Sequence, residues 1–247
     1  MAMSAEILIY TGLVFLFAAF VHGSIGFAFP MISTSLLALV TDIQTAIILT
    51  LIPTILVNLV TIATEGGFVI ALRQHKTLAL LAMLGSAAGT HILIYNDSDI
   101  FKGLLAFAII FYLVMNKVNI RLSWVRTYPK LSRTFFGLSA GVLGGLTNVM
   151  APILIIYSIE SRYTKKEVIQ SSNICFLMGK IIQLFLFTLY GEFSLQHLSV
   201  SSGMVVVVAV ALYFGVAVKK RINADLYIKI LKVLLLILAL TLLVKIV

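Results

Sequence analysis

Hydrophobic residues fall in long runs along this chain, separated by short segments that hold most of the charges. The runs do not alternate between apolar and polar positions, so they predict helices and not the strands of a membrane barrel. Most of them reach the length of about 17–25 residues at which a helix crosses a bilayer. The expected helical segments are 6–22, 31–40, 43–64, 77–95, 101–115, 134–147, 152–159, 167–190, 198–217 and 226–246. The pattern predicts an all-α, polytopic transmembrane helical bundle.

Two of these segments, 31–40 and 152–159, are too short to cross a bilayer alone. A proline stands directly before the first and opens the second, and proline fits the first turn of a helix because no N–H is needed there. Non-helical backbone at membrane depth is tolerated only where it is buried in protein or lines a cavity. We therefore expect two broken helices, at Pro30 and at Pro152, and expect the breaks to build a site.

The basic residues indicate how the segments are oriented. Most of the 18 Lys and Arg residues lie in four short segments, 73–76, 117–133, 162–166 and 219–221. The positive-inside rule assigns all four to the cytoplasmic side. Segment 134–159 then has basic segments on both sides, so it enters and leaves on the cytoplasmic face as a re-entrant hairpin. Segment 6–40 is its counterpart from outside, since no Lys or Arg precedes it and Asp42 follows it.

The two halves of the chain also align with each other. An offset of 122 superposes Gly23 on Gly145, Pro30 on Pro152, Asn58 on Lys180 and Thr61 on Gln183, and an offset of 126 brings Gly89 onto Gly215. We expect a first repeat at 1–116, a basic cytoplasmic linker at 117–133 and a second repeat at 134–247. Each repeat has a broken hairpin plus three crossings, so the second is inverted. Inverted repeats are typical of transporters that bind substrate near the membrane midplane.

Lys180 is the strongest candidate for binding chemistry. It lies about 20 Å from the start of the predicted helix 167–190, at 1.5 Å per residue. A lysine this deep costs at least about 2.5–3.5 kcal/mol, which marks it as functional. No Asp or Glu falls within an apolar segment to pair with it, and Asn173 and Gln183 share its helix face. The alternative is a lysine that only reaches outward to lipid headgroups or to Glu192.

The N-termini of the two half-helices add a positive dipole end each, which favours an anion. Side-chain donors lie at both breaks, and Asn58 is the repeat counterpart of Lys180. His22 is either a proton carrier or a buried, hydrogen-bonded histidine. The substrate-binding residues predicted are His22, Gly23, Ser24, Gly26, Phe27, Ala28, Phe29, Asn58, Gly145, Thr147, Asn148, Val149, Met150, Ala151, Asn173, Lys180 and Gln183.

Composition narrows the function classes. Hydrophobic residues make up 61% of the 247 and charged residues 11%, against about a quarter charged in soluble domains. The net charge of +9 belongs to cytoplasmic loops and not to nucleic-acid binding. No metal-ligand cluster or cofactor motif is present, so neither metal nor cofactor is expected. The shortage of buried acids disfavours an intramembrane enzyme and a cation carrier.

The residues at the breaks, GSIGFAFP at 23–30 and GLTNVMAP at 145–152, resemble the TauE/SafE sulfite exporter family. GSAAG at 85–89, the basic central segment and the overall length also resemble it, although family members usually carry a glycine-richer break. The resemblance implies export, or sometimes uptake, of sulfite or small organosulfonates across the plasma membrane, with the substrate at the two breaks.

We therefore expect a multi-pass transporter of a small anion in the cell membrane. Another small anion such as a carboxylate, taken up with protons, remains an alternative, and an enzyme or membrane scaffold is disfavoured. The expected partners are the anion and the lipid bilayer, with a homodimer left open.

Overall fold

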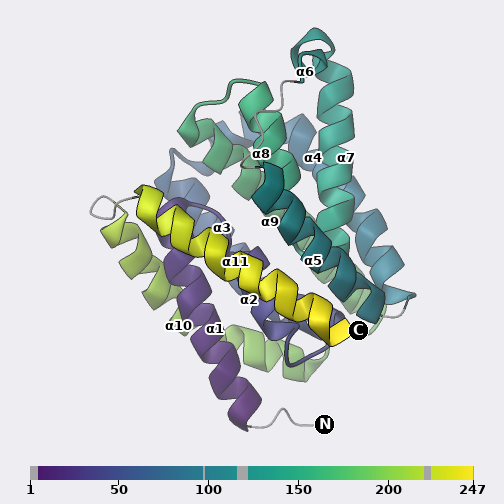
Figure 1. The fold of residues 1–247 in the computed structure, drawn as a ribbon, viewed down its shortest axis with the longest axis vertical. Helices are drawn as coiled ribbons and strands as arrows, with labels where there is room; N and C mark the ends of the chain where they lie inside the picture. The colour runs from purple at the N-terminus through teal and green to yellow at the C-terminus, as the bar shows by residue number, and fades with distance from the viewer. Residues whose placement is uncertain (1–4, 97, 116–121, 220–223, 247) are drawn as a thin grey trace.

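The computed structural model describes residues 5–96, 98–115, 122–219 and 224–246, and within them the chain forms 11 helices and no strand (Figure 1). The helices are α1 (Ala5–Ile25), α2 (Phe29–Leu37), α3 (Ile43–Thr64), α4 (Phe68–Ile94), α5 (Ser98–Met115), α6 (Trp124–Thr127), α7 (Pro129–Thr147), α8 (Ala151–Glu160), α9 (Lys165–Leu189), α10 (Leu195–Val218) and α11 (Ala224–Ile246). The prediction of an all-helical chain is confirmed.

Five of the helices, α1, α3, α4, α9 and α10, are long and apolar enough to cross a membrane. Shorter apolar stretches lie in α5, α8 and α11. Large hydrophobic side chains remain exposed along these helices, among them Leu84, Phe185 and Val206. Contiguous apolar surface on this scale is uncommon on a soluble monomer, and a lipid bilayer accounts for it.

Both predicted helix breaks are present. α1 ends at Ile25 and α2 begins at Phe29, and between them Gly26 and Ala28 have positive φ angles of 92° and 129°. In the second break Asn148 has a left-handed φ of 67°, three residues before α8 begins. A left-handed residue ends a helix without continuing its turn. The chain therefore reverses at each break and starts the next helix at a proline-containing turn.

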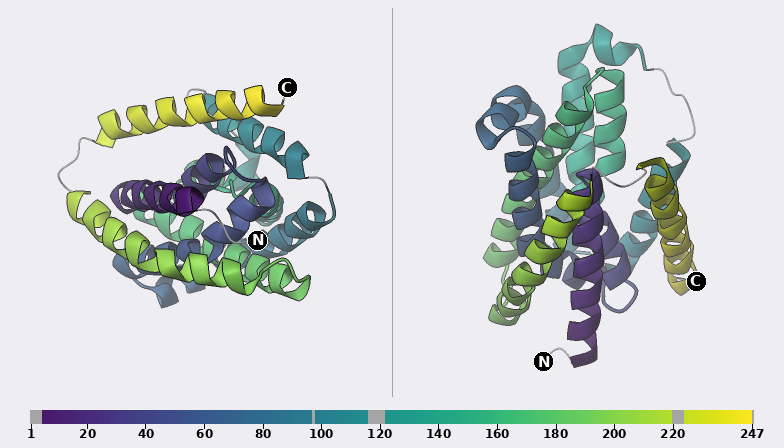
Figure 2. Two further views of the ribbon diagram at one scale, coloured as in Figure 1. Left: turned by 90° about the horizontal axis from the view of Figure 1, so that it is seen from below. Right: turned by 90° about the vertical axis from the view of Figure 1, so that its left-hand side faces the viewer.

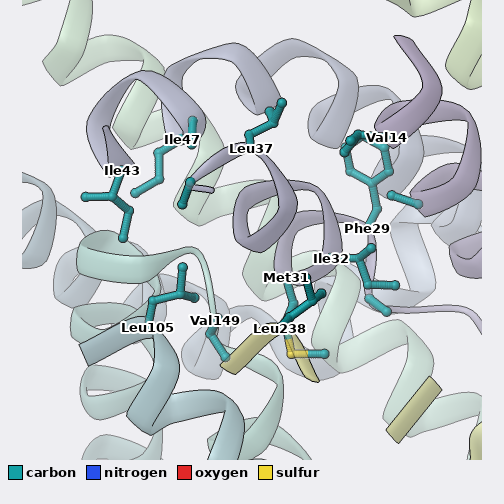
Figure 3. Packing of buried hydrophobic residues seen from close by; sticks show 14 of the residues in the cluster. Val14, Phe29, Met31, Ile32, Leu37, Ile43, Ile47, Leu105, Val149 and Leu238 are labelled. Carbon is teal, nitrogen blue, oxygen red and sulfur yellow. The ribbon is translucent and has the colours of Figure 1, made fainter. Parts of the chain in front are cut away.

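α3 and α9 pack against each other in the bundle. Figure 2 shows α10 (lime) and α11 (yellow) on opposite sides of α1 (purple). α10 packs on α3 and α4 packs on α9, while α1 lies along α10 and α7 lies along α4. α5 and α11 pack together, and α11 runs across the face of the molecule seen in Figure 1. Figure 3 shows Met31 and Ile32 of α2 in one buried cluster with Leu105 of α5 and Leu238 of α11.

Glycines allow two of these helix pairs to touch through their backbones. A Cβ atom built on Gly141 of α7 would lie 2.2 Å from the carbonyl oxygen of Ala82 in α4, and one on Gly145 would lie 2.6 Å from that of Ser86. A Cβ atom on Gly215 of α10 would lie 2.3 Å from the carbonyl oxygen of Phe20 in α1. Small residues are the usual way for membrane helices to approach this closely.

Polar contacts join the ends of the central helices to their neighbours. At the start of α3, Gln44 Nε2 donates to Glu192 Oε2 at 2.9 Å. At the other end of α3, Glu65 forms an ion pair with Lys219 after α10, and its backbone oxygen accepts from Gln170 Nε2 of α9 at 2.8 Å. Polar contacts therefore connect both ends of α3 to neighbouring segments of the bundle.

The structure differs from the predicted segments at two places. α4 begins at Phe68 and not near residue 77, because the turn after α3 is made by Gly66 and Gly67, which have positive φ angles. Arg73 and Lys76 therefore lie on the exposed side of a helix. α6 and the start of α7 lie within the range 117–133, where the hydrophobic pattern predicts no helical segment.

Candidate functional site

The Lys180 side chain lies inside the bundle with only 2% of its surface exposed. It is in the middle third of α9, and its Nζ donates hydrogen bonds to the side-chain oxygens of Asn148 and Gln183. Asn148 belongs to the α7–α8 break and Gln183 lies one turn further along α9. The structure thus brings together the predicted lysine and the predicted second break.

The amide of Asn148 is held in one orientation by α2 and α3. Its Nδ2 donates to Thr34 Oγ1 at 2.7 Å and to Thr50 Oγ1 at 2.9 Å, which leaves Oδ1 to face Lys180. Gln183 is oriented likewise, because its Nε2 donates to the backbone oxygen of Gly145 at 3.2 Å. Residues of α2, α3 and α7 therefore orient the two amides that accept hydrogen bonds from the ammonium group.

No carboxylate from the described part of the chain pairs with this ammonium group. Among the residues that the structure describes, no Asp or Glu forms an ion pair or hydrogen bond with Lys180, and no group of acids, histidines or cysteines could hold a metal ion. Two amide oxygens supply hydrogen bonds but no negative charge. A buried charge is stable only when it is paired or well solvated by dipoles, so the arrangement favours an anion as the missing partner.

The N-terminus of α8 adds to this preference. α8 has 10 residues and starts at Ala151, three positions after the asparagine that contacts Lys180. The N-terminal end of a helix behaves as roughly half a positive charge. α7 ends at Thr147 on the other side of Asn148, so the break that Lys180 contacts has the positive end of α8 and the negative end of α7 within a few residues of each other.

The first break forms a separate polar cluster. His22 Nε2 is 3.1 Å from Thr61 Oγ1 of α3, and the backbone N–H of Phe29 donates to His22 Nδ1 at 3.2 Å. Asn173 Nδ2 donates to the backbone oxygen of Gly26 at 2.7 Å. Because Nδ1 accepts a hydrogen bond, the proton of the neutral ring lies on Nε2 and is donated to Thr61. His22 and Asn173 are thus in contact with the first break and not with Lys180.

Several buried polar atoms have no hydrogen-bond partner among the described residues. They include Thr54 Oγ1 and both polar atoms of the Asn58 amide on α3, and Ser172 Oγ and Asn173 Oδ1 on α9. Thr54 and Asn58 are one helical turn apart and share a face of α3. Buried polar atoms of this kind are normally satisfied by water or ligand.

Three predicted residues have a packing role in this structure. Gly23 and Gly145 lie at the backbone contacts with α10 and α4. Ser24 Oγ donates to the backbone oxygen of Phe20 in its own helix at 2.9 Å and lies 3.4 Å from the backbone oxygen of Gly215 in α10. The remaining break residues are buried or nearly so: Phe27, Ala28, Phe29, Thr147, Val149, Met150 and Ala151.

Thr34 and Thr50 are site residues that the sequence alone did not single out. Both orient Asn148, and both are fully buried. The available signal was the polar triplet 33–35 in an otherwise apolar half-helix. Hydroxyl groups in membrane helices often bond only their own backbone, as Ser33 does with Phe29, so the signal was ambiguous.

The fold and the site define a multi-pass, all-helical membrane protein with a buried lysine at a helix break that has no acidic partner among the residues that the structure describes. A family model described as sulfite exporter TauE/SafE matches residues 11–242. The chain therefore belongs to the TauE/SafE sulfite exporter family, which is a family of membrane transporters, and the resemblance of the two break motifs is confirmed. No curated protein and no solved structure matches the chain.

Proposed function

We propose that this protein transports a small anion, sulfite or a small organosulfonate, out of the cell through the plasma membrane, with Lys180 as the fixed positive charge of the binding site. The observation that carries the proposal is the burial of Lys180 at the α7–α8 break without a carboxylate partner among the described residues. Family membership agrees with an anionic substrate.

The proposed site offsets the free energy that an anion loses when it leaves water to cross a membrane. An oxyanion leaves water only if donors and a countercharge replace its hydration. Lys180 supplies the charge and the α8 N-terminus a dipole, while the amides of Asn148 and Gln183 hold the ammonium group in place. The interior-negative membrane potential favours anion exit by about 2.3 kcal/mol per charge per 100 mV.

We propose that the anion moves between the levels of the two breaks along α3 and α9. Thr54 and Asn58 lie between Thr50, next to the Lys180 site, and Thr61, next to His22. Their unpartnered polar atoms, with Ser172 on α9, would supply successive hydrogen bonds along this route. Asn58 of the first repeat aligns with Lys180 of the second repeat. The first repeat therefore contributes an uncharged amide to this route, and the second contributes a positive charge.

We also propose that the two halves are inverted repeats related by a pseudo-two-fold axis. The packing supports this, because α1 with α10 corresponds to α7 with α4, and α3 with α10 corresponds to α9 with α4. The backbone contact of Gly23 with Gly215 corresponds to that of Gly145 with Gly89. The offset of 122 also aligns Asp42 with Thr164, which cap the N-termini of α3 and α9.

Cysteine labelling tests the topology that this symmetry requires. In intact cells a membrane-impermeant thiol reagent is expected to label Glu192→Cys and not Arg126→Cys. The native Cys175 is fully buried and serves as the unreactive background. Labelling of Arg126→Cys from outside would contradict the inverted arrangement, because that residue lies between the two halves.

An internal carboxylate tests the anion site directly. Gln183→Glu places a negative charge beside Lys180 while keeping the oxygen that accepts its hydrogen bond. We expect the new ion pair to replace the substrate and to weaken sulfite binding at least about tenfold, or about 1.4 kcal/mol. Binding is measured by the shift in melting temperature of the purified protein with sulfite, methanesulfonate, taurine and acetate.

Gln74→Glu is the matched control, because Gln74 is exposed on α4 and gains the same charge far from the site. It is expected to bind the anion as the wild type does. Equal affinity in the wild type and Gln183→Glu would refute the site, and a preference for acetate over the sulfur anions would replace the proposed substrate with a carboxylate.

A further inference from the structure

A cavity with two arginines in its lining lies beside α6 and the end of α8; Figure 1 labels α6 at the top of the molecule. The cavity has a volume of about 450 Å³ and is lined by Ser123, Arg126, Ile159, Glu160 and Arg162. The backbone N–H groups of both arginines are hydrogen-bonded, but neither guanidinium group forms a hydrogen bond or ion pair with a residue that the structure describes. The two guanidinium groups are therefore free to bind an anion from outside the chain.

The one carboxylate in the cavity is already engaged. Glu160 Oε2 accepts the backbone N–H of Leu122 at 2.8 Å and so ties the segment before α6 to the end of α8. Two arginines and one glutamate leave a positive balance. Guanidinium groups bind phosphate through paired N–H donors, which makes a phosphate group the best match for the cavity.

The surroundings favour a phosphate that is carried by a lipid. Ile159 lines the cavity and is 63% exposed, and Leu131 and Phe135 on the neighbouring α7 are 62% and 55% exposed. Trp124 of α6 stacks on Phe136 with ring centroids 5.8 Å apart. Tryptophan beside exposed apolar side chains and arginines is typical of the membrane–water interface.

We infer that this cavity binds the phosphate group of an anionic phospholipid, with the acyl chains against Ile159, Leu131 and Phe135. The cytoplasmic leaflet, where the charge pattern places α6, supplies such lipids. The bound headgroup would hold α6 against the end of α8, the half-helix that begins at the Lys180 site. The inference does not depend on what the protein transports.

Lipid binding to the full-length purified protein tests the inference without any transport assay. Native mass spectrometry and melting temperature are measured with phosphatidylglycerol, phosphatidylcholine and inorganic phosphate. We expect phosphatidylglycerol to bind the wild type and the Arg126→Gln, Arg162→Gln double variant to bind it at least about tenfold more weakly. Phosphatidylcholine is expected to bind weakly to both.

The double variant Arg73→Gln, Lys76→Gln is the control, since it removes two exposed cations from α4. Retained phosphatidylglycerol binding in this control supports a specific site. An equal loss in both double variants would mean that surface charge alone attracts the lipid. Stabilisation by inorganic phosphate to the same extent as by the lipid would overturn the lipid assignment, and unchanged binding in the Arg126→Gln, Arg162→Gln variant would overturn the site.

Discussion

Lys180→Met is expected to lower anion affinity at least about a hundredfold, which corresponds to about 2.8 kcal/mol. Methionine has nearly the length of lysine and fills the same space without a charge. The amides of Asn148 and Gln183 and the dipole end of α8 remain, but they supply no full countercharge. Lys180→Arg should retain part of the affinity, because the charge persists while the donor geometry changes.

Lys76→Met is the control for this experiment, because it removes an exposed lysine from α4 and should leave binding unchanged. Size-exclusion profiles and melting temperatures establish that each variant is folded. Titration with sulfite then gives the affinities. If the folded Lys180→Met protein bound sulfite as tightly as the wild type, Lys180 would have no part in the anion site.

The second large effect is expected at the crossing of α4 and α7. In Gly141→Ala the added Cβ would meet the carbonyl oxygen of Ala82 at 2.2 Å and the backbone nitrogen of Ser86 at 2.7 Å. Backbone atoms cannot move aside as a flexible side chain can, so the two helices must separate. We expect destabilisation of about 1–3 kcal/mol or more, seen as a lower melting temperature and a poor yield of folded protein.

Gly203→Ala makes the same chemical change on α10, where no atom lies within 4 Å of the new Cβ. Replacing an unstrained helical glycine with alanine is expected to stabilise by roughly 0.5–1 kcal/mol. Comparing the stabilities of the two variants separates the effect of the helix–helix contact from the effect of the higher helix propensity of alanine. A melting temperature of Gly141→Ala equal to that of the wild type would mean that the close approach of α4 and α7 contributes nothing to stability.

The helix breaks and the buried lysine could be predicted because each violates a strong rule of membrane sequences. Pro30 and Pro152 each interrupt an apolar run, and the apolar segment after each proline is too short to cross a bilayer. Lys180 is a charged residue within an apolar helix. Such features have few alternative explanations. The start of α4 was less clear, since Arg73 and Lys76 look like a loop in a hydropathy count but lie on the exposed side of a helix.

The grouping of site residues could not be predicted from helix faces alone. Asn173, Lys180 and Gln183 share a face of α9, yet seven residues separate the first two, which is about 10 Å along a helix. α9 contacts both breaks, so Asn173 bonds Gly26 while Lys180 bonds Asn148. Which break each residue meets depends on the level at which α1 and α7 end, and that level is a property of tertiary packing.

The contacts at the two ends of α3 differ in how they depend on salt. Glu65 and Lys219 form a partly exposed ion pair, and pairs of this kind contribute about 0–1 kcal/mol and weaken as salt increases. Gln44 and Glu192 are joined by an amide–carboxylate hydrogen bond, in which only one partner is charged. Ionic strength is therefore expected to weaken the contact at the Glu65 end of α3 more than the contact at the Gln44 end.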